Sequence, residues 1–429
     1  MRLGGEIKVK GVDITSGELT INYETTGKIQ RVITGNEIFL SADRDFSQVP
    51  ESVAVIPFVS TVAPVCWALD AQLTIPELDS DYLEALRKIK PVIAEMNPSQ
   101  SWRGQLTVSS IETNKPPVSG DPLALFSGGV DSLATYARHQ DENPSLVPIH
   151  GSDISIENES AWQELKQGLE KFAAKEENSQ LIPIKTDIRE CIDHNLLASY
   201  LGVSSKWWWI QVQHGLLLTS LPAPLAYLEG SPRLYIASSH WFPRPWASHP
   251  EIDNKVRYAG IQAVHDGYEL TRQDKMGVIA DYLRSVRHQP TIRSCYESNS
   301  GDNCSNCEKC CRTILGLELE GIDPNNHGYS VDSTTFEYMQ DSLVSGEWHL
   351  KDTDVRFWKD LQSHCERGQS LPHSKAEEFV EWFVDVDEPL FENAKGDHKP
   401  PFADRVIPYL KYLPYPLYKN GLALFRLIS

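Results

Sequence analysis

The sequence predicts an α/β protein with a doubly wound parallel sheet, a strand-rich N-terminal domain and a mainly helical C-terminal extension. Three observations lead to this prediction. Residues 1–118 form short alternating runs, residues 119–325 alternate apolar strands with amphipathic helices, and residues 326–429 become polar and aromatic. Strict alternation of strands and helices is typical of a parallel sheet that is covered on both faces.

The first region, residues 1–118, is expected to consist mainly of strands and hairpins. Runs such as "EIKVKG", "ELTINYET" and "EIFLSA" are separated by Gly, Asp and Ser, which is the usual pattern of short strands. A helix is expected over residues 79–96. The segment "IETNKPPVSGDP", residues 111–122, concentrates Pro, Gly, Asn and Asp, so it marks the expected domain boundary.

The second region, residues 119–325, begins with the strand "PLALF" and a helix after "SGGVDS". Further strands are expected in "SLVPIHG", "QLIPIKT", "RLYIASS" and "AVHDGYEL", and further helices in "ESAWQELKQGLEKFAAK", "KWWWIQVQHGLLLTSL" and "RQDKMGVIADYLRSV". The apolar residues of "ESAWQELKQGLEKFAAK" recur three or four positions apart, which predicts one buried face. Thr271 and Asp274 have the spacing of a capping box.

The stretch "SGGVDS" predicts a loop that binds phosphate. Gly128 and Gly129 permit a tight turn at the end of a strand, and the next helix adds its positive end. Ser127 and Ser132 can donate hydrogen bonds, and Asp131 can hold Mg²⁺. The stretch lacks the glycine spacing and the lysine of a Walker A loop. A plain Gly-Gly turn with no ligand is the alternative interpretation.

The cysteines between residues 295 and 311 predict a zinc site. Cys295, Cys304, Cys307 and Cys310 are separated by eight, two and two residues, and four thiolates close a tetrahedral zinc shell. Cys311 is an alternative fourth ligand. Bacterial ferredoxins leave three residues between their third and fourth cysteines, and this chain has Ile314 at that position, so an iron–sulfur cluster is not expected.

The overall charge and hydropathy restrict the class of protein. A formal net charge of -19 argues against a broad basic surface, so bulk binding of nucleic acid is not expected. No apolar run resembles a secretory signal or reaches the length that crosses a bilayer. We therefore expect a cytoplasmic protein that does not bind membranes.

The strand followed by "SGGVDS" resembles the PP-loop of the ATP pyrophosphatase superfamily, whose fold is a Rossmann-like (HUP-type) parallel sheet. This resemblance implies that the backbone and side chains of one loop hold the pyrophosphate end of ATP together with Mg²⁺. The residues of this loop are Ser127, Gly128, Gly129, Val130, Asp131 and Ser132. A substrate oxygen then attacks the α-phosphate. The resemblance says little about the substrate.

Together, "FSGGVDS", "ELTRQDKMGVIADYL" and the cysteine spacing resemble the 7-cyano-7-deazaguanine synthase (QueC) family over about residues 122–323. The resemblance implies adenylation of the carboxylate of 7-carboxy-7-deazaguanine, then attack by a nitrogen nucleophile to give an amide. It assigns Asp131, Ser132 and Lys275 as catalytic residues and Zn²⁺ to the cysteines. Val130 departs from the family's usual Gln, and its Tyr-Gly-Gln signature is missing after the second strand.

The acceptor of the acyl group is left open by the sequence. In the QueC family ammonia is the nucleophile and a nitrile is the product. The extra segments before and after the matched region resemble the extended QueC-like proteins of bacterial anti-phage systems (Qat and type IV CBASS). That resemblance implies an amine of a partner protein as the acceptor. A PP-loop enzyme acting on transfer RNA, and a subunit that binds ATP without splitting it, are further alternatives.

A second group of candidate residues lies in residues 238–253. His240, Arg244, Trp246, His249 and Asp253 combine aromatic faces, an acid and bases, which recognition of a purine-like ring would need. A packed lid is the alternative for this loop. His150, at the end of the second strand, is expected to touch adenine. His265 and Asp266 are expected to form a structural pair.

Overall fold

The computed structural model describes residues 4–176, 178–242, 246–295, 297–298, 302–387, 390–391, 406–414 and 417–418. In these ranges the strands are β1 (Glu6–Ile14), β2 (Glu18–Thr26), β3 (Glu37–Ser41), β4 (Gln72–Asp79), β5 (Gln105–Glu112), β6 (Leu123–Leu125), β7 (Ser145–Val147), β8 (Ile149–His150), β9 (Ile184–Thr186), β10 (Arg233–Ala237), β11 (Arg257–Tyr258) and β12 (Ile261–Asp266).

The helices of the same ranges are α1 (Glu51–Ala54), α2 (Ile56–Leu69), α3 (Ser80–Met96), α4 (Val130–His139), α5 (Glu159–Ala173), α6 (His194–Leu201), α7 (Ser205–Trp208), α8 (His214–Ser220), α9 (Ala223–Glu229), α10 (Pro250–Asp253), α11 (Arg272–Ser285), α12 (Glu308–Leu319), α13 (Thr335–Ser345), α14 (Asp352–Ser363) and α15 (Ser374–Phe383). The segment η4 (Trp209–Gln213), between α7 and α8, is a π-helix.

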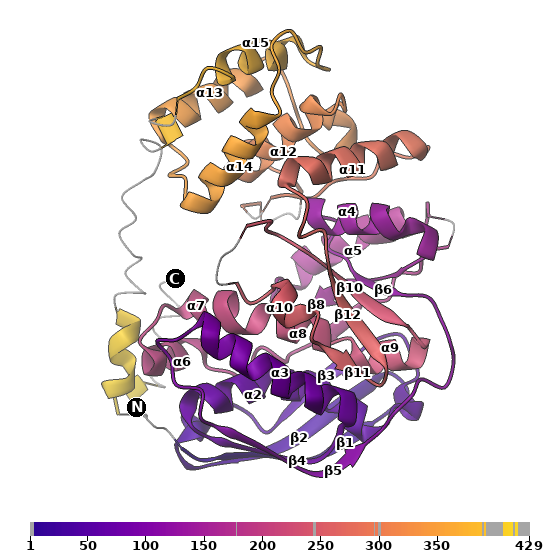
Figure 1. Ribbon diagram of the computed structural model, residues 1–429, viewed down its shortest axis with the longest axis vertical. Coiled ribbons are helices and arrows are strands. Elements are labelled where there is room, and N and C mark those ends of the chain that lie inside the picture. Colours follow the sequence, from indigo (N-terminus) through magenta and orange to yellow (C-terminus); the bar gives the residue numbers. More distant parts are fainter. Residues whose placement is uncertain are drawn as a thin grey trace.

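The N-terminal strands form part of a seven-stranded sheet in the order β5-β4-β1-β2-β3-β9-β8. Strands β1, β2 and β3 are antiparallel neighbours, and β1, β4 and β5 are parallel (Figure 1). β9 comes from the central region and pairs with β3, where Leu40 lies opposite Thr186. One hydrophobic core therefore runs across residue 118, and the domain boundary there stays a prediction.

The N-terminal region contains one long helix that the sequence pattern did not predict. α2 is buried along its whole length, so apolar residues surround its axis. A helix of this kind has no polar face, and its sequence shows no helical period that would distinguish it from a buried strand. α3 was expected and forms at Ser80–Met96.

The second sheet has the order β11-β12-β10-β6-β7, in which β12, β10, β6 and β7 are parallel. The chain runs outward from β6 to β7 and, in the other direction, from β10 to β12. The strand order thus reverses between β6 and β10, where open α/β sheets usually bind ligands. The predicted α/β fold with parallel strands is confirmed, whereas its assignment to the PP-loop type stays a prediction.

The strand expected in "SLVPIHG" is divided between the two sheets. β7 pairs with β6, whereas β8 pairs with β9 in the other sheet. Pro148 lies between them and has no N–H group to continue a ladder. The central region therefore contributes strands to both sheets, which differs from the single sheet that we expected.

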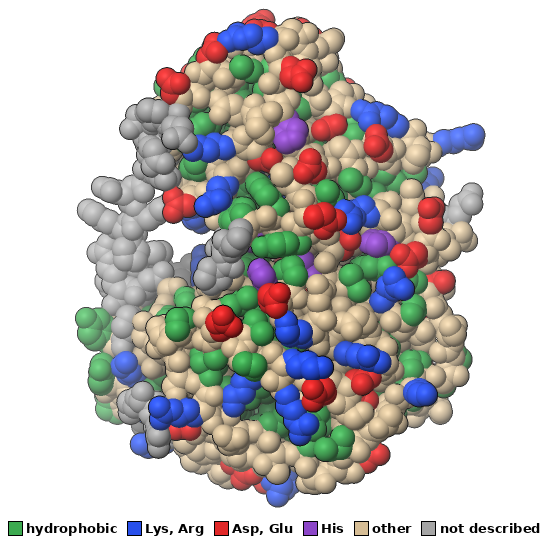
Figure 2. All heavy atoms as spheres, viewed as in Figure 1, with side chains coloured by type: hydrophobic (Ala, Val, Ile, Leu, Met, Phe, Trp, Pro, Cys, Tyr) green, Lys and Arg blue, Asp and Glu red, His purple; other side chains and the backbone are tan. Residues whose placement is uncertain are grey.

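The C-terminal helices α12–α15 pack with α4 and α11 around a second hydrophobic core. This mainly helical region lies at the top of Figure 1, with the sheets below it. Lys and Arg side chains are interspersed with Asp and Glu on the face that Figure 2 shows. None of the helices in the described part of the chain has the length and apolar character needed to cross a bilayer.

Candidate functional site

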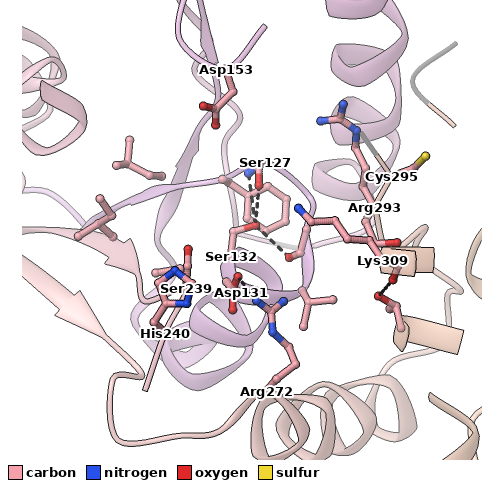
Figure 3. A pocket seen from close by; sticks show the side chains of 18 of the residues that line it. Ser127, Asp131, Ser132, Asp153, Ser239, His240, Arg272, Arg293, Cys295 and Lys309 are labelled. Atoms are coloured by element: carbon pink, nitrogen blue, oxygen red, sulfur yellow. Dashed lines mark hydrogen bonds and ion pairs between the residues drawn. The ribbon is translucent and has the colours of Figure 1, made fainter. Parts of the chain in front are cut away.

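A cavity of about 610 Å³ lies at the carboxyl ends of β6 and β10. This volume is in the range of sites that bind small molecules. Its walls come from the "SGGVDS" loop, the loop after β8, the first residues of α8 and α11, the segment before the cysteines, and helices α12 and α14. Figure 3 shows this arrangement, with Ser127 and Ser132 near its centre.

The "SGGVDS" loop is held by hydrogen bonds among its own residues. Gly128 has φ +70°, a left-handed conformation that favours glycine. The hydroxyl of Ser132 donates to the carbonyl of Gly129 at 3.1 Å and accepts from the Ser127 N–H at 3.3 Å. The loop ends at the N-terminus of α4, whose positive end favours an anion. The sequence-predicted phosphate loop thus has the conformation of an anion site.

Asp131 lies at the floor of the cavity between two cations. Arg272 donates to its Oδ2 at 2.9 Å, and the Nζ of Lys275 lies 3.2 Å from its Oδ1. Burial by itself raises the pKa of Asp131, but Arg272 and Lys275 outweigh burial and hold the pKa below its usual range. The carboxylate is therefore charged at neutral pH.

The predicted role of Asp131 as a magnesium ligand is not tested by this geometry. Each carboxylate oxygen faces one cation and keeps a further lone pair that can accept a ligand. Lys275 is only 2% exposed and also donates to the carbonyl of Ser238, so it lies behind Asp131 and does not line the cavity. Mg²⁺ stays a prediction of the sequence.

Four cationic side chains line the cavity around the loop: Arg272, Arg293, Lys309 and Arg312. The backbone N–H of Arg293 donates to the carbonyl of Gly128 at 2.9 Å, which fastens the segment before the cysteines to the loop. Burial lowers the pKa of Lys309 to about 8, and the neighbouring Arg312 and Arg272 add to this effect. Clustered cations of this kind suit the oxygens of a polyphosphate.

Sequence reasoning assigned no role to these four cations. They come from α11, α12 and the segment between them, and the chain brings them together only in the folded state. Two local signals existed. Arg272 directly follows the N-cap residue Thr271, whose capping box with Asp274 is confirmed, and Lys309 lies between two predicted zinc ligands.

The C-terminal region contributes α14 to the cavity wall. Phe357 lies with its ring 4.1 Å from the guanidinium of Arg312 and 5.0 Å from that of Arg272. Thr353, Asp354 and Leu361 of the same helix also line the cavity. Cations over an aromatic face are held by the ring's quadrupole, so Phe357 orients two of the four cations.

We expect Phe357→Ala to raise the Kd for ATP by roughly 3- to 30-fold, since a cation–π contact contributes about 0.5–2 kcal/mol. Phe357→Tyr keeps the ring face and should bind ATP like the unaltered protein, whereas Phe357→Leu fills space without a ring and should bind weakly. Isothermal titration with ATP measures the three values. Equal affinity of the Tyr and Leu variants would contradict the orienting role.

A row of aromatic and imidazole rings forms another wall of the cavity. The ring of His214 lies 4.9 Å from that of Trp209 and 5.7 Å from that of Trp246, and Trp246 lies 5.0 Å from His240. All four line the cavity. Sequence analysis predicted Trp246 and His240 here, but assigned no chemistry to Trp209 and His214.

Asp153 and Ser239 also line the cavity. In Figure 3, Asp153 lies apart from Asp131 and Arg272, with Ser127 between them. His240 and Ser239 lie on one side of this view, and Arg293 and Lys309 lie on the other. In this view Arg272 lies beside Asp131, between these two groups.

The four predicted cysteines lie together. Their sulfur atoms are all within 4.8 Å of one another, and Cys295 lies 4.0 Å from Cys307. A tetrahedral zinc site with Zn–S bonds of 2.3 Å requires sulfur atoms about 3.8 Å apart, so the cluster fits zinc. The thiol of Cys311 points to the carbonyl of Ser305 and is not part of the group. The geometry thus favours Cys310 as the fourth ligand.

Several residues predicted to contact the ligand lie outside the cavity lining. His150 is buried, stacks on Trp162 at 4.8 Å and has its Nε2 3.1 Å from the Ser155 carbonyl. Nearby, Ile149 and Ile154 line the cavity instead. The predicted contact of His150 with adenine would therefore require a rearrangement.

Of the residues predicted in the loop 238–253, His240 and Trp246 line the cavity, whereas His249 and Asp253 do not. His249 caps α10, and Asp253 is buried, where it accepts from Ser248 and lies 2.7 Å from Nδ1 of His265. Arg244 lies outside the described residues. His265 pairs with Asp253, and Asp266 pairs with His139 at 3.0 Å, so the expected His265–Asp266 pair is wrong.

The chain is similar to a known enzyme over about half of its length. Over 220 residues it is 24% identical to the 7-cyano-7-deazaguanine synthase of Chlorobium phaeovibrioides (strain DSM 265 / 1930). The aligned part covers 47% of this chain and 94% of that protein, so about half of this chain has no counterpart in it. No protein family profile and no solved structure matches the chain.

Proposed function

We propose that this chain uses ATP to adenylate the carboxylate of a 7-carboxy-7-deazaguanine-type acid and then transfers the acyl group to a nitrogen nucleophile. The similarity to a 7-cyano-7-deazaguanine synthase suggests ATP-dependent chemistry of the pyrophosphatase type. Formation of the acyl-adenylate releases pyrophosphate, and attack by nitrogen releases AMP and forms an amide.

The observation that carries this proposal is the position of the four cations around the "SGGVDS" loop. Arg272, Arg293, Lys309 and Arg312 can neutralise the β- and γ-phosphates as these leave together. The loop's backbone and hydroxyl groups supply the remaining donors. The indole rings of Trp209 and Trp246 in the cavity wall offer flat surfaces for a heteroaromatic acid, which cations alone would not provide.

The acceptor that we propose is an amine of a partner protein, as the resemblance to anti-phage proteins implies. An acyl-adenylate reacts with any amine that is held near its carbonyl carbon, so a new acceptor requires a docking surface and leaves activation unchanged. The half of this chain that has no counterpart in the matched synthase could supply that surface. Ammonia is the alternative acceptor, with a nitrile as the final product.

We expect 7-carboxy-7-deazaguanine to stimulate exchange of labelled pyrophosphate into ATP, because the first half-reaction is reversible and needs no acceptor. 7-Cyano-7-deazaguanine, which has the same ring but no carboxylate, is the matched control and should not stimulate exchange. Mass spectrometry of the products then identifies amide, nitrile or protein adduct. An exchange rate that is the same with and without the acid would contradict adenylation of this substrate.

A further inference from the structure

The ring-lined wall of the cavity includes one titratable group, His214, for which the proposed adenylation step has no chemical role. The π-helix η4 ends at Gln213, directly before His214, and π-helices often occur at functional sites. Two backbone hydrogen bonds fix this segment: Ala247 N–H donates to the Ile210 carbonyl at 2.8 Å, and Gly215 N–H donates to the Ala247 carbonyl at 3.2 Å. Trp246 is thereby held beside His214.

Close backbone packing fixes the position of His214 as well. A Cβ atom on the next residue, Gly215, would lie 2.1 Å from Oδ1 of Asp253 and 2.4 Å from the carbonyl oxygen of Ala247. Only glycine lets α8 approach so closely. The imidazole of His214 therefore projects into the cavity from a backbone that cannot shift away.

The ring of His214 is not occupied by structural hydrogen bonds. Its Nδ1 is buried and has no hydrogen-bond partner among the described residues. Nε2 is therefore the nitrogen that a bound molecule can reach. The charged and titratable groups that act electrostatically on the His214 ring are Asp153, Asp253, Arg189 and His265. Burial is the largest effect and lowers the pKa of His214, and the two carboxylates oppose it.

We propose that His214 is the base of the second half-reaction and takes a proton from the attacking amine at its Nε2. This inference rests on the proposed function and assigns the step that consumes the acyl-adenylate. The amine nitrogen bonds to the carbonyl carbon, the bond from that carbon to the AMP oxygen breaks, and AMP leaves with the electron pair. His214 holds the amine proton and later returns it to water.

The first half-reaction has no need of such a base. A carboxylate attacks the α-phosphate without losing a proton, whereas an amine that is protonated at neutral pH must lose a proton before its lone pair can form a bond. Among the other cavity groups, arginine does not deprotonate in proteins, Asp131 is engaged by two cations, and Lys309 lies with the cations around the phosphate loop. Asp153 also lines the cavity and acts electrostatically on His214. His240 lies at the Asp131 end, where the phosphates would sit, and contributes to the electrostatic field on that carboxylate.

The test measures the two half-reactions separately in the His214→Gln variant of the full chain, with ATP and 7-carboxy-7-deazaguanine as substrates. Pyrophosphate exchange should be little changed, whereas amide formation from ammonium chloride or glycinamide should fall by roughly 100-fold, the usual contribution of a general base. Hydroxylamine is largely unprotonated at neutral pH and needs no base, so hydroxamate formation should be retained. His349→Gln, an exposed histidine outside the cavity, is the matched control.

The results distinguish failure of this inference from failure of the proposed function. Loss of exchange, amide and hydroxamate together in His214→Gln would show that His214 supports folding or adenylation and would overturn its role as a base. Unchanged amide formation in His214→Gln would also overturn the role of His214 as a base. The same conclusion would follow if the unaltered protein formed hydroxamate but no amide. Absence of acid-stimulated exchange in the unaltered protein would refute the proposed function itself.

Discussion

Replacement of Asp131 by alanine should lower acid-dependent release of pyrophosphate by roughly 100-fold or more, as loss of one preorganised electrostatic group in an active site does. Asp131 holds Arg272 at 2.9 Å and so keeps this cation at the floor of the cavity. Without the carboxylate, the guanidinium loses its ion pair and keeps the Phe357 ring as the one contact given above, so its position is less well fixed. Release of pyrophosphate and AMP, measured in a coupled assay, reports the loss.

The same substitution should also destabilise the fold, and this effect has to be separated from catalysis. Lys275 is 2% exposed and would keep only the Ser238 carbonyl as a partner. Breaking a buried ion pair costs about 3–5 kcal/mol, and the cost here is smaller because Asp131 is 21% exposed. Asp131→Asn combined with Lys275→Met removes both charges, so it should recover stability but not activity.

Asp281→Asn is the matched control for the Asp131 variants. Asp281 lies on the same helix as Arg272 and pairs with Arg284, but it is 84% exposed. An exposed pair of this kind contributes about 0–1 kcal/mol, so neither activity nor the melting temperature should change much. Recovery of activity along with stability in the double variant would contradict a direct role of Asp131.

The part of the site that could be predicted from the sequence is the part that is local in the chain. The phosphate loop and the four cysteines each fit within one short segment, where glycine conformation and ligand spacing determine the chemistry. Arg272, Arg293 and Arg312 are ordinary surface residues by sequence, and only tertiary packing gathers them. His214 lies in the apolar run "KWWWIQVQHGLLLTSL", which was expected to form a helix, and no local motif marked it as a site residue.

The fold shows the same division between local and long-range information. Amphipathic α3 and α5 were predicted, since each has one buried face. The addition of β9 to the N-terminal sheet was not predictable, because it depends on pairing between residues about 146 positions apart. Asp253 was predicted to contact ligand because of its loop. Its burial against His265 depends on a strand that follows it in the chain.

Cys310→Ala should abolish zinc binding, whereas Cys311→Ala should leave about one zinc per chain. Both thiols are fully buried, so the two substitutions remove equal volume from the same helix and differ mainly in whether a ligand is lost. Three cysteines cannot close the tetrahedral shell that a structural zinc requires. Zinc content by plasma mass spectrometry measures the difference, and loss of zinc from both variants would contradict the assignment of Cys310.

Loss of zinc should reduce activity as well as stability, because the cluster lies between the cations. Cys307 is the N-cap of α12, which carries Lys309 and Arg312, and Cys295 follows Arg293 by two residues. The metal would thus fix both segments that place cations around the phosphate loop. Cys310→Ala should therefore raise the Kd for ATP beyond any change in Cys311→Ala, even below the melting temperature. If both variants bind ATP equally, the cations are held by the rest of the fold and the zinc acts on stability alone.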